Sequence, residues 1–146
     1  MRALLLAVAS LLVAGCDQDS LIQPDQIVGD TIPQSLTSTP GNPEAGRAVF
    51  VEREAGHCVL CHVVQGLEVP FQGDLGPALT DVGARLTPEQ IRLRVVDASI
   101  LNPDSVMPPY YRIHRLHQVA DGLAGQPVLS SEQVEDLVAY LAGLKG

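Results

Sequence analysis

Three reactive side chains of this chain, those of Cys58, Cys61 and His62, form the pattern C-x-x-C-H. Two thiols at this spacing can add to the two vinyl groups of a haem, and the histidine that follows them then lies under the iron as its proximal ligand. The pattern predicts one covalently attached haem c, held by Cys58 and Cys61 and ligated by His62.

Two other kinds of site use paired cysteines. A zinc site would need a second pair of ligands at metal-binding spacing, and the third cysteine, Cys16, lies far from the motif. A thioredoxin-like dithiol belongs in a strand–helix–strand unit, and the sequence around the motif has no such pattern. Both interpretations are weaker than haem attachment.

A second iron ligand is predicted from Met107, the only methionine after the first residue, which is followed by Pro108 and Pro109. The prolines exclude a helix there, and a loop methionine suits the far face of a haem. A thioether ligand raises the reduction potential, so His/Met ligation predicts electron transfer without an open coordination position. The alternatives are a methionine that fills a gap in the core, or ligation by His114 or His117.

The N-terminus is apolar but too short to span a membrane. Within residues 1–15, the basic residue Arg2 is followed by a short apolar run, which is typical of a secretory signal peptide. Small residues precede Cys16. This pattern resembles a bacterial lipoprotein signal, and the resemblance implies that Cys16 is lipidated. We expect a periplasmic protein anchored to the membrane by lipid; the alternative is a plain signal peptide with an incidental cysteine.

The composition fits one small domain with an unusual core. The chain has 146 residues and a net charge of −8. The negative charge excludes non-specific binding to nucleic acid, which needs basic residues to neutralise phosphates. It contains three tyrosines, two phenylalanines and no tryptophan, although aromatic residues normally dominate the burial in a small core. The flat apolar surface of a haem would replace them. The candidates for contacts with haem propionates or a partner are Arg92, Arg94, Arg112 and Arg115.

The chain after the signal divides into an arm and a domain. Residues 16–41 are polar and rich in proline, which indicates a lipidated tether and arm. Residues 42–146 carry helical patterns and form the predicted cytochrome c domain. The stretch from Leu101 to Leu129 has little helical signal, and a loop of that length must be organised by something inside the molecule.

Three capped helices are predicted. Asn42 precedes Pro43 and begins a helix that we expect to end at Gly56. Thr87 and Ser130 each begin a capping box, and the last helix carries an apolar stripe. No segment alternates in polarity over a convincing length, so the predicted fold is all-α with long loops around the haem.

The order of these features resembles class I cytochrome c: a capped helix, the C-x-x-C-H motif, a Gly-Pro loop, a middle helix, a Met-Pro loop and a final amphipathic helix. The resemblance implies that the first and last helices cross near Gly46, Phe50 and Tyr140. It also implies that the carbonyl of Pro77 accepts the second ring N–H of His62, as ligating histidines usually require. An ordinary loop turn is the alternative for Pro77.

A set of short motifs also resembles the SoxX family, the monohaem subunits of SoxAX cytochromes. Each motif alone is weak, but the ordered set covers nearly the whole chain from about residue 30. The motifs are Ile32-Pro33-Gln34-Ser35-Leu36-Thr37, Pro40-Gly41-Asn42-Pro43, Gly46-Arg47-Ala48, Gly76-Pro77, Val82-Gly83-Ala84-Arg85, Leu93-Arg94-Val95-Val96-Asp97, Asn102-Pro103-Asp104, Met107-Pro108-Pro109-Tyr110-Tyr111-Arg112, Gly125-Gln126-Pro127-Val128-Leu129 and Val134-Glu135-Asp136-Leu137-Val138-Ala139-Tyr140-Leu141.

This resemblance implies an electron-transfer subunit paired with SoxA. Such a complex, an L-cysteine S-thiosulfotransferase, joins thiosulfate to a cysteine of the SoxYZ carrier and passes electrons to a diffusible cytochrome c. The catalytic centre is expected on SoxA, because Cys16, Cys58 and Cys61 leave this chain no free thiol. The alternative is a stand-alone, membrane-tethered class I cytochrome c that serves another respiratory oxidoreductase.

Overall fold

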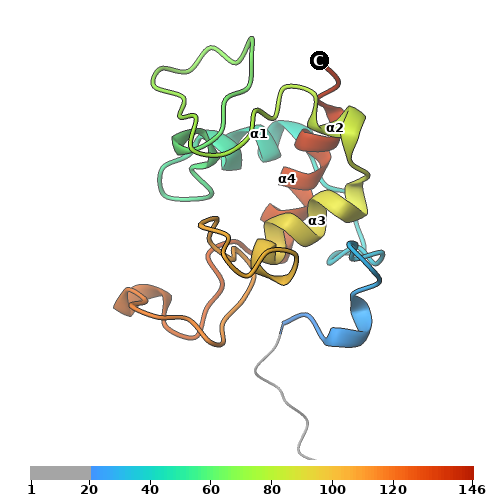
Figure 1. The fold of residues 1–146 in the computed structure, drawn as a ribbon, viewed down its shortest axis with the longest axis vertical. Helices are drawn as coiled ribbons and strands as arrows, with labels where there is room; N and C mark the ends of the chain where they lie inside the picture. Colours follow the sequence, from blue (N-terminus) through green and yellow to red (C-terminus); the bar gives the residue numbers. More distant parts are fainter. Residues whose placement is uncertain (1–20) are drawn as a thin grey trace, which may run out of the picture.

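The computed structural model describes residues 21–146, and these residues form an all-α fold in which no strand occurs. The predicted fold class is confirmed (Figure 1). The α-helices are α1 (Pro43–Val51), α2 (Val82–Arg85), α3 (Pro88–Asp97) and α4 (Ser131–Gly143). The short 3-10 helices are η1 (Pro24–Gln26), η2 (Cys58–Leu60), η3 (Ala98–Ile100) and η4 (Asp121–Leu123).

The three long helices begin where the sequence predicts. The side chain of Asn42 accepts hydrogen bonds from the first turn of α1, and Thr87 and Ser130 form complete capping boxes at α3 and α4. The predicted end of the first helix is wrong. Helix α1 ends at Val51, because the chain turns back there and the Gly56 N–H donates to the Val49 carbonyl at 3.1 Å.

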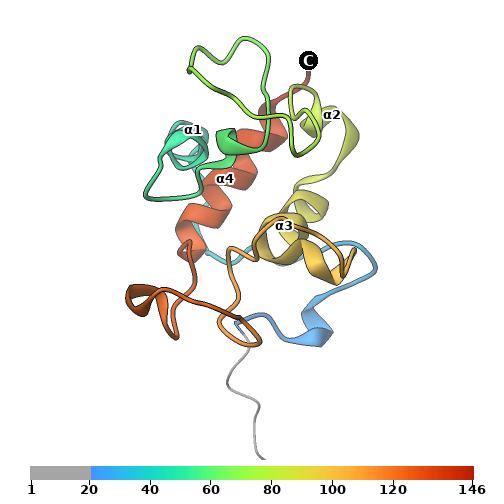
Figure 2. The ribbon, with the colours of Figure 1, turned by 60° about the vertical axis from the view of Figure 1, so that its left-hand side comes forward.

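Helices α1 and α4 cross at close range (Figure 2). Gly46 permits the approach, since a Cβ there would collide with the backbone carbonyl of Asp136 on α4. The rings of Phe50 and Tyr140 pack beside it with centroids 5.5 Å apart at 56°. The residues that the resemblance placed at this crossing are therefore found there.

The N-terminal arm is fixed to the domain from Asp30 to Leu36. The Ile32 N–H donates to the Glu89 carbonyl at 3.1 Å, and the Ile32 side chain is fully buried. The Leu36 N–H donates to the Glu135 carboxylate at 2.9 Å. The arm thus crosses both α3 and α4.

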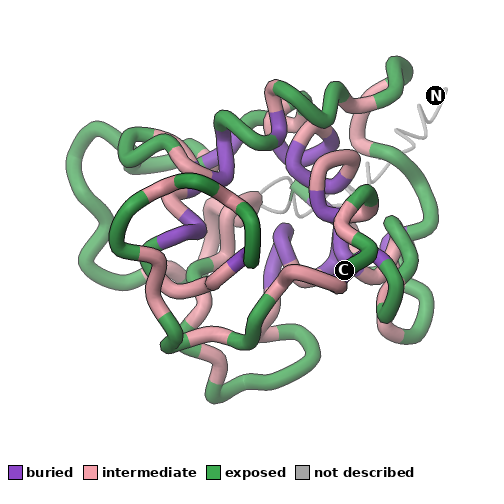
Figure 3. Tube along the Cα trace, turned by 90° about the horizontal axis from the view of Figure 1, so that it is seen from above, coloured by how far each residue is buried: buried purple, intermediate pink, exposed green. Residues whose placement is uncertain are grey.

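The buried residues gather where the helices meet, and the surrounding loops are exposed (Figure 3). The long stretch from Leu101 to Leu129 is held to the rest of the domain by Tyr110, Tyr111 and Arg112, and Arg112 pairs with Asp97. Tyr110 and Tyr111 donate their N–H groups to carbonyls of α3 at 3.3 and 3.2 Å, and the Leu129 N–H donates to Tyr110 at 3.0 Å. Residues 117–126 between these contacts are exposed.

None of the helices within residues 21–146 is both long and apolar enough to cross a membrane. The predicted signal peptide and the predicted lipidation site, Cys16, lie outside the described residues.

Candidate cofactor site

A large apolar cleft of about 720 Å³ opens on the side of the helical core. Ligand pockets in proteins usually measure about 300–1,000 Å³, so this cleft can hold a cofactor. Its walls bring together the five residues of the predicted haem site: Cys58, Cys61, His62, Pro77 and Met107.

The two cysteines lie on one tight turn at the wall of the cleft. Cys58 begins η2, and the N–H groups of Cys61 and His62 both donate to its carbonyl, at 3.1 and 2.9 Å. Burial raises the pKa of the Cys58 thiol to about 12. Dithiol redox enzymes need a lowered thiol pKa, so this environment disfavours the thioredoxin-like alternative.

His62 is held in one orientation by the loop after it. Its Nδ1 lies 2.8 Å from the carbonyl oxygen of Pro77. A carbonyl only accepts, so Nδ1 carries the proton and the lone pair is on Nε2, the arrangement that ligating histidines use. Gly76 leaves room for the ring, because a Cβ at this position would collide with His62.

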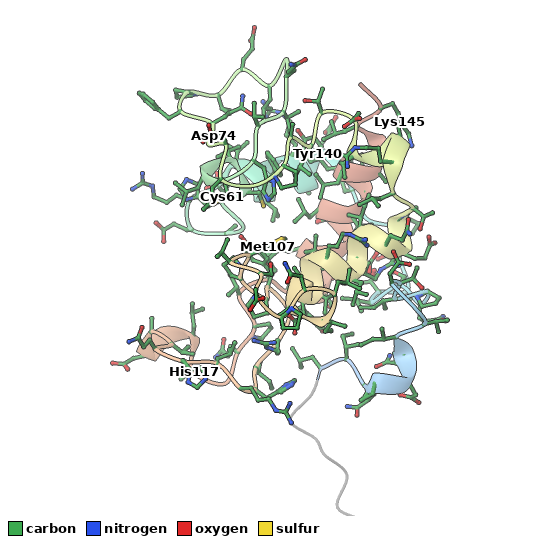
Figure 4. The ribbon with its side chains drawn as sticks, in the orientation of Figure 1. Cys61, Asp74, Met107, His117, Tyr140 and Lys145 are labelled. Carbon is green, nitrogen blue, oxygen red and sulfur yellow. The ribbon has the colours of Figure 1, made fainter. Side chains whose placement is uncertain are left out.

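Met107 lies on the opposite wall of the cleft from Cys61 (Figure 4). Its N–H donates to the Ser105 hydroxyl at 3.2 Å, which fixes the loop before the two prolines. The site therefore has a histidine on one wall and a thioether on the other. That is the donor set of a low-spin electron-transfer haem.

Several apolar side chains complete the cleft, among them Phe50, Leu79, Leu137 and Leu141. Two attachment thiols, an oriented imidazole, a thioether and an apolar interior fit a covalently bound haem. A zinc alternative lacks ligands, since residues 21–146 hold no group of three His, Cys, Asp or Glu side chains that could bind a metal.

Tyr110 is a residue of the site that sequence reasoning did not single out. It lines the cleft, and its hydroxyl donates to the Gly56 carbonyl at 3.0 Å, next to the attachment turn. Burial raises the pKa of Tyr110 far above its usual value, so the phenol stays neutral. Its position after the Met-Pro-Pro run was the only available signal.

The candidate arginines divide between two environments. Arg94 lines the cleft, as does Arg85, although Arg94 also pairs with Asp30 at 3.3 Å and Arg85 with Asp81 at 2.9 Å. Arg92 is instead buried in an ion pair with Glu135, and Arg112 pairs with Asp97 at 2.6 Å. None of the other three candidates, Arg92, Arg112 and Arg115, lines the cleft.

The rival histidine ligands lie elsewhere. His114 and His117 do not line the cleft, and His117 lies on an outlying loop far from Cys61 and Met107 (Figure 4). His57 does line it, beside Cys58, in a left-handed backbone conformation with φ of 46°. These positions leave Met107 as the better-placed partner of His62.

Comparison with known proteins agrees with this geometry. The family model for cytochrome c matches residues 43–145. A chain of the crystal structure of SoxXA from P. pantotrophus is 35% identical, with a TM-score of 0.76, over 82% of this chain and 93% of that chain. This chain is a cytochrome c of the SoxX type. The cytochrome c domain implies covalently bound haem c and a role in electron transfer.

A second solved structure has lower sequence identity and lower structural similarity to this SoxX-type cytochrome. The c-type cytochrome SorU from Sinorhizobium meliloti is 24% identical, with a TM-score of 0.46, over 71% of this chain and 91% of that one. The comparison with curated proteins gave no match.

Proposed function

We propose that this chain is the electron-transfer subunit of a SoxAX-type cytochrome, in which a SoxA subunit joins thiosulfate to a cysteine of the SoxYZ carrier. The observation that carries the proposal is the 35% identity to a SoxXA chain over nearly the whole of that chain. In this role the chain accepts electrons from its partner and passes them to a diffusible cytochrome c.

The residues of the cleft have separate roles in this proposal. Cys58 and Cys61 hold one haem c, since the sequence contains a single C-x-x-C-H motif. His62 and Met107 ligate the iron, and Pro77 keeps the His62 ring in the ligating tautomer. The bound haem supplies a one-electron couple. The residues supply a cleft with a largely apolar lining, on whose walls both ligands would be held in place as the charge changes.

The sulfur chemistry is assigned to the partner. Joining a thiol to thiosulfate forms one S–S bond and releases two electrons and the thiol proton, and a one-electron cofactor held by this chain would take up such electrons one at a time. The chain has no spare thiol for this bond once its cysteines are used. Its net charge of −8 also repels an anionic substrate.

Localisation to the periplasm with a lipid anchor at Cys16 completes the proposal. Mass spectrometry of the mature protein tests both attachments in one measurement. We expect the mass of a chain that begins at Cys16, plus one haem and a diacylglycerol-type lipid. A mature chain that begins elsewhere and lacks acyl mass would contradict the anchor and leave the haem assignment intact.

The electron-transfer role is tested by reconstitution. The oxidised chain is mixed with a SoxA subunit, SoxYZ and thiosulfate, and reduction of its haem is followed by absorbance. We expect reduction only when all components are present. Full activity as a lone monomer with another respiratory oxidoreductase, without reduction in the complete mixture, would favour the stand-alone cytochrome instead.

A further inference from the structure

The loop that carries Met107 has few contacts of its own to hold it at the cleft. None of residues 101–109 is buried. The Met107 N–H donates to the Ser105 hydroxyl, and the other hydrogen bonds of the loop are equally local. In the part of the chain that the structure describes, none of them reaches beyond residues 98–109. The position of Met107 therefore depends on how the two ends of the loop are fixed.

Both ends of this loop meet at Asp97, the last residue of α3, whose side chain is 6% exposed. One carboxylate oxygen accepts from the N–H and the hydroxyl of Ser99, at 3.0 and 2.5 Å, where the chain leaves the helix. The other oxygen accepts from Nη1 of Arg112 at 2.6 Å, where the chain returns. The same Nη1 donates to the Ser99 hydroxyl at 3.0 Å. These three side chains form the neck of the loop.

The ion pair is the strongest contact at the returning end of the loop. The other contacts there are neutral: Tyr110 and Tyr111 donate their N–H groups to α3 at 3.3 and 3.2 Å, and the Tyr110 hydroxyl donates to Gly56 at 3.0 Å. Hydrogen bonds between charged groups are shorter and about twice as strong. The Arg112 Nε has no hydrogen-bond partner among the described residues, and Asp97 is the ion-pair partner of this guanidinium.

We propose that Asp97 is a positioning residue for the iron ligand: through Arg112 it keeps the neck closed and so holds Met107 against the cofactor. The inference rests on the proposed function, in which Met107 ligates the haem iron. Without the ion pair the returning chain can move away from α3, and the state in which the thioether has left the iron becomes more populated. Loss of this ligand would lower the reduction potential.

The test compares Asp97→Asn and Arg112→Gln with Met107→Ala in the reduced holo protein. Asparagine still offers an oxygen to the Ser99 N–H, so Asp97→Asn removes the ion pair and leaves the turn after α3 capped. Carbon monoxide binds only when the sixth position is free, so its apparent Kd reports how often Met107 is away. We expect this Kd to fall about tenfold or more in both neck variants, the factor that one hydrogen bond between charged groups supplies. It should fall furthest in Met107→Ala.

Glu135→Gln is the matched control. It also breaks a buried ion pair of α3, the pair with Arg92, but the further hydrogen bonds of that pair go to the N-terminal arm and not to the loop of Met107. It should lower the free energy of unfolding in urea and leave the Kd for carbon monoxide unchanged. An equal fall of this Kd in Glu135→Gln would show that general loosening explains the effect, and the role of Asp97 would be refuted.

The remaining outcomes separate this inference from the function on which it rests. If Met107→Ala binds carbon monoxide no more tightly than the unaltered chain, Met107 is not the ligand, and that part of the proposed function fails together with the inference. If Met107→Ala binds more tightly and the neck variants do not, only the role of Asp97 is wrong. If Asp97→Asn does not fold with its haem, Arg112→Gln decides, because it leaves Asp97 and Ser99 in contact.

Discussion

Arg92 and Glu135 form a bidentate ion pair inside the protein, with Nε–Oε1 and Nη2–Oε2 distances of 2.7 and 2.9 Å. Their side chains are only 7% and 5% exposed. The pair also holds the arm, because Arg92 donates to the Ile32 carbonyl and Glu135 accepts from the Leu36 N–H. One buried pair therefore joins α3, α4 and the N-terminal arm.

Removal of the Glu135 carboxylate from this pair should lower the free energy of unfolding strongly. Glu135→Gln leaves the Arg92 charge buried without a counter-ion, and such changes cost about 3–5 kcal/mol. Urea unfolding of the holo protein measures the loss. The control is Asp81→Asn, which breaks the pair with Arg85, where the side chains are 50% and 46% exposed. It should cost about 0–1 kcal/mol; equal losses in both variants would contradict this account.

The same pair predicts a dependence of stability on pH. Burial alone raises the pKa of Glu135, but the hydrogen bonds from Arg92 and Leu36 outweigh it and hold the pKa below its ordinary value. A lowered pKa in the folded state stabilises the protein above the unfolded-state pKa of about 4.3. This contribution is lost as pH falls through the lower folded value. Unfolding free energies measured across this range should fall less steeply in Glu135→Gln, and parallel curves would refute the prediction.

Gly46→Ala should separate the two crossing helices. The new Cβ would collide with the Asp136 carbonyl, which is backbone and cannot swing away. We expect a loss of about 1–3 kcal/mol from overpacking, although alanine is the better helix former. Gly143→Ala is the control, because nothing lies within 4 Å of its Cβ. Thermal unfolding should show a lower Tm for the first variant only.

Gly76→Ala should act on the haem through His62. The added Cβ would displace the imidazole ring and weaken its 2.8 Å hydrogen bond to Pro77. We expect a changed ferric spectrum and an altered reduction potential. Gly122→Ala, where nothing lies within 4 Å, should change neither. An unaltered spectrum and potential in Gly76→Ala would show that the ring is not held by this contact.

Met107→Ala should open the sixth coordination position. Loss of the thioether lowers the reduction potential, which axial ligands can move over about 0.8 V, and lets carbon monoxide bind the reduced protein. Spectroelectrochemistry measures both effects. His114→Ala is the control, since His114 does not line the cleft. A preserved potential in Met107→Ala would exclude Met107 as the ligand.

Local signals predicted where the three long helices begin. The caps at Asn42, Thr87 and Ser130 are short-range features that a sequence displays directly. Helix α2 has four residues, too few for a helical period to appear in the sequence. The early end of α1 depends on a turn whose hydrogen bond from Gly56 to Val49 is not visible as a pattern.

Long-range contacts explain what the sequence did not predict. The arm was expected to be a polar tether, but Ile32 and Leu36 are fixed by residues far along the chain. Arg92 was a candidate for a haem contact, because a lone arginine in a sequence does not reveal its partner. The sequence also does not show that the Tyr110 side chain is turned inward and the Phe71 side chain outward, because long-range packing decides both.

The crossing of the arm over α3 and α4 has a mechanical consequence. A pull on the chain before residue 21 would act on the bonds of Ile32 and Leu36 before it reached α1 or the attachment turn. The arm and the loop of residues 65–76 lie at opposite ends of the molecule in Figures 1 and 2. Tension applied at the N-terminus would therefore be borne first by the contacts of the arm with α3 and α4, and only afterwards by the segments that carry the attachment turn.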